Sequence, residues 1–207
     1  MNVEAEILKA SDFGQQIEAL VIDKRQCHCS SERERLLLGY WSLLFDYHGG
    51  ILTLLSHRGY GSAFALVRPT MEAMVRAHLV LICSDADFKQ IVDDKYRTDF
   101  TMVGKQIDEV CGTRIDKFLN DAREALHSFT HSGVSQLSRR FEGDDLQATF
   151  SPGEIVEVIR ATTSAVFMVT ACVTKHFGFE EEWKRCGELF IAWGSRPEPP
   201  VAVDTSG

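Results

Sequence analysis

The sequence predicts an all-α fold, a mainly antiparallel bundle of about six to seven helices. Apolar residues recur at helical spacing over most of the chain, and helix start and stop signals separate the segments. No alternation of strands with helices is present. We expect a single domain over residues 1–194 and a disordered tail over residues 195–207, which holds three prolines and no apolar cluster.

Two helices are expected in the first quarter of the chain. The first covers about residues 3–24, where apolar residues repeat near the helical period. Ser31 and Glu34 have the spacing of a capping box, in which each side chain bonds to the backbone N–H of the other residue, and they open the second helix. Gly49 and Gly50 interrupt that helix, so we expect it to be weak or bent there.

The third helix is expected over about residues 62–83, after a turn marked by Gly59 and Gly61. Pro69 lies inside this helix and lacks a backbone donor, which predicts a kink. A kink at this point would free backbone carbonyls beside Arg68. Kinks also arise from packing alone, and that is the interpretation we favour.

Further helices follow, each bounded by a cap or a glycine, and they are expected over residues 84–111, 113–133, 151–177 and 180–193. Ser151 and Glu154 form a second capping box, with Pro152 at the first helical position. Residues 134–150 are expected to form a short helix and then an irregular loop at residues 142–145.

The composition is that of a soluble globular protein, with 44% hydrophobic and 25% charged residues. No apolar run reaches the roughly 18 residues needed to cross a membrane, and the N-terminus lacks the features of a signal peptide. We therefore expect a cytoplasmic protein without membrane association. The formal net charge of −8 argues against broad binding to DNA phosphates, although a local basic patch stays open.

The cysteines do not predict a metal site. Of the six, only Cys27 and Cys29 are close in sequence, and the single residue between them is fewer than the two to four found in zinc sites. Free thiols in a reducing compartment are expected, with no metal and no other cofactor.

The first polar cluster lies inside the apolar third helix. Arg68, Glu72 and Arg76 are four residues apart and so share one helix face, where Glu72 can accept from either arginine. Ionisable groups in apolar surroundings are costly unless they are paired. Two interpretations stay open: an ion network that fixes helix register, or an anion or phosphate pocket with one guanidinium left free for a ligand.

The second polar cluster is near residue 130, where His127 and His131 also share a helix face and Arg139 and Arg140 follow. Position 128 is Ser, so the His-Glu-x-x-His motif of metalloproteases is absent. A metal would need a third ligand, for which the candidates are His48, His57, His78 and Glu72. Hydrogen-bonded core or pocket histidines are the favoured interpretation.

Arg68 and Glu72 in an apolar helix, together with the segment Leu126-His-Ser-Phe-Thr-His-Ser-Gly133, resemble a group of uncharacterised bacterial helical proteins related to HEPN and abortive-infection-type bundles. The resemblance covers about residues 40–140. It implies a dimeric, metal-independent RNase in which four to six residues separate an arginine from a catalytic histidine. Here three residues separate Arg123 from His127 and seven separate it from His131, so the chain departs from that spacing.

The leading hypothesis is an HEPN-like protein with a polar pocket between the third and fifth helices, RNA-directed or associated with phage defence or a toxin–antitoxin pair. If it is an enzyme, it is a metal-independent RNase. His131 would then be the general acid or base, and an arginine would stabilise the charge on the phosphorane. The predicted catalytic residues are His131, Arg68 and Glu72, and the predicted substrate-binding residues are Arg76, His127, Arg139 and Arg140.

Two rival hypotheses come from other classes. One is a non-enzymatic interaction protein, a homodimer or the partner of another protein, in which the polar cluster is structural. The weaker one is a metal-dependent hydrolase of the four-helix type that uses His127 and His131. Convergence of Arg68, Glu72 and His131 would favour the leading hypothesis.

Overall fold

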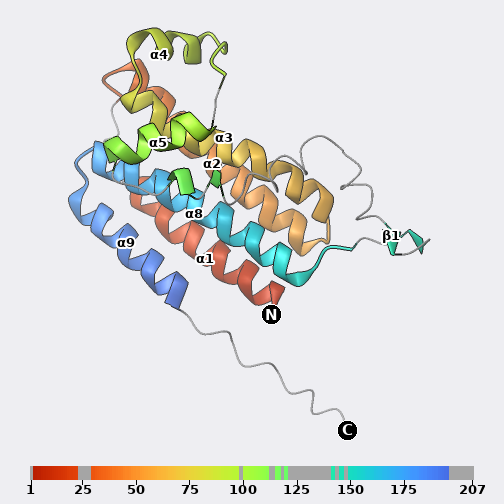
Figure 1. Cartoon of the computed structure of the whole chain (residues 1–207). Helices are drawn as coiled ribbons and strands as arrows, with labels where there is room; N and C mark the ends of the chain where they lie inside the picture. Colours follow the sequence, from red (N-terminus) through yellow and green to blue (C-terminus); the bar gives the residue numbers. More distant parts are fainter. Residues whose placement is uncertain are drawn as a thin grey trace.

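The protein is a bundle of long helices, as the sequence predicts (Figure 1). The computed structural model describes residues 2–22, 29–97, 100–111, 115–117, 119–120, 141–142, 145–146 and 149–195. The helices are α1 (Val3–Ile22), α2 (Glu32–Ser56), α3 (Tyr60–Ile82), α4 (Asp85–Val92), α5 (Phe100–Cys111), α8 (Pro152–His176) and α9 (Glu180–Ser195). Residues 115–117 and 119–120 are helical as well.

Helix α8 lies at the centre of the bundle and packs against α1, α2, α3 and α9. Figure 1 shows these long helices side by side, with α4 and α5 at one end of α3. Ile159, Val166 and Val169 of α8 are completely buried. Because β-branched residues are modest helix formers, burial of this apolar surface is what holds α8 helical.

Helix α8 is long and apolar enough, by length and composition, to cross a membrane. More than half of its apolar stretch, 56%, is buried inside the bundle. Its apolar character is therefore explained by its place as the core helix.

Both predicted capping boxes are confirmed. Ser31 accepts from the backbone N–H of Glu34 at 3.2 Å, and Glu34 accepts from that of Ser31 at the same distance. Ser151 and Glu154 repeat the arrangement at the start of α8, with Pro152 at the first helical position. These local hydrogen bonds satisfy backbone donors that a helix start leaves exposed.

Helices α2 and α3 differ in detail from the prediction. Helix α2 continues without a break through Gly49 and Gly50. Its packing against α3 and α8 compensates for the low helix propensity of glycine. Helix α3 begins at Tyr60, so Gly61 lies within the helix rather than in the turn. Pro69 lies inside α3, as expected.

The predicted helix over residues 84–111 is wrong as a single element. Helix α4 ends at Val92, and α5 begins only at Phe100. Asp93 and Asp94 follow α4, and Asp94 has a left-handed backbone with φ 52°. Aspartates at a helix C-terminus oppose the helix dipole, and aspartate tolerates the left-handed region better than most residues. This pair therefore ends the helix.

The stretch predicted as an irregular loop contains a short hairpin. β1 (Phe141–Glu142) pairs antiparallel with β2 (Asp145–Leu146), and Phe141 lies opposite Leu146. Most of the predicted fifth helix, the short helix before the hairpin and the C-terminal tail after Ser195 lie outside the described residues.

Candidate functional site

Two members of the first polar cluster, Arg68 and Glu72, form an ion pair on α3. The Nε of Arg68 donates to Oε1 of Glu72 at 2.9 Å. The two side chains are half-buried, with 27% and 36% of their surface exposed. Helical spacing allows Glu72 to pair with Arg68 or with Arg76, and in the structure it pairs with Arg68.

Arg76, the third member, turns to the connection between α4 and α5. One terminal nitrogen lies 3.5 Å from Oδ1 of Asp94, and the other donates to the backbone oxygen of Tyr96 at 3.5 Å. Burial acts to lower the pKa of Arg76, but contacts with Tyr40 and Asp94 outweigh it and raise the pKa. The Nε of Arg76 is buried and has no hydrogen-bond partner among the described residues.

The second polar cluster lies outside the described residues. His127, His131, Arg139 and Arg140 fall in the stretch between residues 120 and 141. The predicted meeting of His131 with Arg68 and Glu72 therefore stays a prediction. The spacing between Arg123 and the two histidines, which differs from that of the RNases, is known from the sequence alone.

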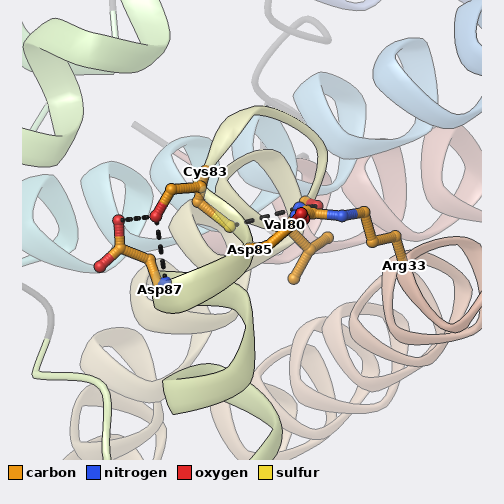
Figure 2. Close-up of polar contacts among 6 residues, drawn as sticks. Arg33, Val80, Cys83, Asp85 and Asp87 are labelled. Atoms are coloured by element: carbon orange, nitrogen blue, oxygen red, sulfur yellow. Dashed lines mark hydrogen bonds and ion pairs between the residues drawn. The ribbon is translucent and has the colours of Figure 1, made fainter.

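A polar cluster that the sequence did not predict joins the start of α2 to the end of α3 (Figure 2). Arg33 donates to the backbone oxygen of Val80 at 2.6 Å and pairs with Asp85 at 2.8 Å. It also donates to the thiol of Cys83 at 3.4 Å, and its guanidinium lies 4.3 Å from the centre of the Phe88 ring. Arg33 thus satisfies a carbonyl at the end of α3 and holds the start of α4.

The histidines considered as additional metal ligands are separate from one another. His48 is buried, and its Nδ1 lies 3.3 Å from Oγ1 of Thr162. His78 is also buried and bonds to the backbone oxygen of Met74 at 2.9 Å. His57 is exposed at the end of α2. No group of three or more His, Cys, Asp or Glu side chains suited to a metal occurs within the described part of the chain.

The buried histidines have unusual protonation chemistry. Burial lowers the pKa of His48 to about 4, and the carbonyl of Ala10 offsets part of this effect. Burial also lowers the pKa of His78, against the opposing influence of the Met74 carbonyl and the Asp108 carboxylate. Both rings are therefore neutral at neutral pH and serve as packed, hydrogen-bonded core residues.

Residues 41–190 match a family of unknown function, DUF6988. The chain belongs to this family. No curated protein and no solved structure shows significant similarity to the chain. The family match carries no link to HEPN or abortive-infection bundles, so that relationship stays a prediction.

The part of the chain shared with the DUF6988 family contains both predicted polar clusters. It begins within α2 and ends within α9, so it leaves out α1 and Arg33. The family region therefore includes the three charged residues of α3 and the segment with His127 and His131. Arg33 precedes this region in the sequence and contacts residues within it.

Proposed function

We propose that this chain is a non-enzymatic helical interaction protein in which the Arg68–Glu72 pair is structural. The observation that supports this most strongly is the 2.9 Å hydrogen bond between those two side chains. A carboxylate that takes part in catalysis must be able to reach the substrate. Here the carboxylate is bound by a guanidinium of its own helix, so it is held as part of the scaffold.

The proposed partner is a second copy of the chain, with another protein as the alternative. Large apolar side chains lie exposed on α1 and α9, which pack against each other: Leu8 is 71% and Ile191 is 70% exposed. A protein–protein interface would cover such side chains. Light scattering coupled to size exclusion is expected to give a dimer. A monomer at all concentrations would contradict the homodimer and leave a different protein as the partner.

The test of the non-enzymatic assignment is an RNA-cleavage assay with purified protein, mixed RNA and a chelator. No cleavage above the buffer control is expected. Cleavage that disappears in His131→Ala would overturn the proposal. Cleavage that persists unchanged in His131→Ala would instead point to a contaminating nuclease and sink the RNase assignment.

RNA-directed, HEPN-like activity is the second candidate. It is favoured by the residual exposure of Arg68 and Glu72, 27% and 36%, which lets solvent reach the pair. The family match also spans both polar clusters, as a shared site would require. In this hypothesis His131 would approach the pair from the segment after residue 120, with Arg139 and Arg140 on the RNA phosphates.

A further inference from the structure

Arg76 is a largely buried guanidinium whose ion pair with Asp94 is long. Its side chain is 23% exposed and also contacts Tyr40, and its contacts with Asp94 and with the Tyr96 carbonyl are both 3.5 Å long. Charge-assisted bonds from arginine are normally about 2.7 to 2.9 Å. On the same helix, Arg68 binds Glu72 at 2.9 Å. The Arg76–Asp94 ion pair is therefore looser than the Arg68–Glu72 pair.

The guanidinium of Arg76 also has spare donor capacity. Arginine carries five N–H donors in a planar fork. The Nε donor is buried without a hydrogen-bond partner in the described part of the chain. A buried donor left unsatisfied costs free energy, so an acceptor that reached Nε would be favoured.

The carboxylate that faces Arg76 is open to solvent. The side chain of Asp94 is 90% exposed, and its backbone is left-handed with φ 52°. Helix α4, which precedes it, is anchored by Ile91, which is 4% exposed and belongs to the hydrophobic core. The start of α4 is held by Arg33 through Asp85 and Phe88. The Asp94 side chain can therefore turn away from Arg76 into solvent while α4 stays in place.

We propose that Arg76 and Tyr40 form a binding site for a phosphate-class oxyanion, and that Asp94 covers this site in the present structure. The Asp94 carboxylate stands where one edge of the oxyanion would bind. Arg76 would donate through its planar fork, and the Tyr40 hydroxyl would donate to a further oxygen. The site is independent of the proposed interaction function, because a small anion can bind whether or not the chain is an enzyme.

The chemistry favours a tetrahedral oxyanion over a carboxylate. A carboxylate has two oxygens, both of which an arginine fork can occupy. A phosphoryl group has a third oxygen for the hydroxyl of Tyr40, which contacts the Arg76 side chain. Glu72 does not compete for the ligand, because its described partner is Arg68.

The test measures binding of inorganic phosphate by calorimetry at constant ionic strength, with chloride as the matched salt. Asp94→Asn is expected to bind phosphate at least about fivefold more tightly than the unaltered chain, because a competing negative charge is removed. Asp93→Asn is the matched control, because this neighbouring acid pairs with Lys95 at 3.3 Å and not with Arg76. The phosphate affinity of that variant should stay within about twofold of the affinity of the unaltered chain.

Arg76→Gln is expected to abolish binding, and Arg76→Lys, which keeps the charge but lacks the fork, should weaken it. Circular dichroism checks that each variant folds. A parallel titration with glycerol phosphate shows whether the site takes free phosphate or a phosphate ester, and binding of either supports the proposal. Equal affinities of Asp94→Asn and Asp93→Asn, or no binding to any variant, would overturn it.

Discussion

His48 shows how a single residue sets the pH dependence of this fold. It comes from α2 and is 3% exposed, with Thr162 of α8 on one side and α1 on the other. The Ala10 carbonyl favours the charged ring, but it makes no hydrogen bond of good geometry with Nε2. A neutral imidazole fits this position, and an imidazolium does not.

Acid is therefore expected to destabilise the protein through His48. Its pKa is about 4 in the folded chain against an ordinary 6.5, so the unfolded chain takes up the proton first as pH falls. The stability is fully present above pH 6.5 and is lost as pH falls toward 4. Between pH 7 and pH 4.5 the loss amounts to about 2 to 3 kcal/mol.

Urea unfolding at several pH values measures this effect. His48→Gln should be less stable at neutral pH but should lose less stability on acidification than the unaltered chain. His78 is unchanged in both proteins, so its own lowered pKa cancels in the comparison. Parallel pH profiles for the two proteins would contradict the assignment.

Glu72→Ala tests how much the Arg68–Glu72 ion pair contributes to stability. A half-exposed pair of this spacing contributes about 0.3 to 1 kcal/mol, so the melting temperature should fall by roughly 1 to 4 °C. Glu72→Gln, which keeps the size of the side chain, should give a similar fall. A loss above about 3 kcal/mol would indicate a fully buried charge instead.

At the scale of elements, the packing of α5 depends on Gly104. A Cβ at this position would lie 2.9 Å from the Cα of Asp116, which belongs to the next helical residues. Asp108 fastens the same residues by accepting from the backbone N–H groups of Ile115 at 2.7 Å and Asp116 at 3.0 Å. A methyl group would therefore push against backbone that is held in place.

Gly104→Ala is expected to destabilise the protein by about 1 to 3 kcal/mol. Gly39→Ala in α2 is the matched control, because a Cβ there meets nothing within 4 Å. That variant should be stabilised by about 0.5 to 1 kcal/mol, since alanine is the better helix former. Urea unfolding measures both changes, and equal effects of the two variants would show that the contact at Gly104 is unimportant.

The serine caps of α2 and α8 are also expected to stabilise the protein. Ser151→Ala removes the acceptor for the Glu154 N–H at the start of α8 and should cost about 1 kcal/mol. For a chain of this size the melting temperature should fall by about 2 to 4 °C. Ser31→Ala at the start of α2 should do the same. No change in either variant would mean that water replaces the cap fully.

For the whole molecule, the helical architecture was predictable because its signals are local. The capping boxes at Ser31 and Ser151 and the glycine at position 178, which has φ +74°, mark helix ends within a few residues of sequence. The Arg68–Glu72 pair was predictable for the same reason, since helical spacing brings the two side chains together.

Contacts between distant parts of the chain were not predictable in this way. Arg33 reaches Val80 and Asp85 across 47 and 52 positions of sequence, and nothing near Arg33 signals those partners. The end of α4 at Asp93 and Asp94 depends on the same tertiary setting, because Asp94 is placed where Arg76 can reach it. The choice of partner for Arg76 therefore required the fold.

We propose two roles for the charged residues of α3: Arg68 forms a structural ion pair with Glu72, and Arg76 binds an oxyanion when Asp94 moves aside. The most direct test compares the rise in melting temperature on adding phosphate, at matched ionic strength, in Arg68→Gln and Arg76→Gln. We expect Arg68→Gln to keep the rise and Arg76→Gln to lose it. Loss of the rise in Arg68→Gln with retention in Arg76→Gln would contradict the claim.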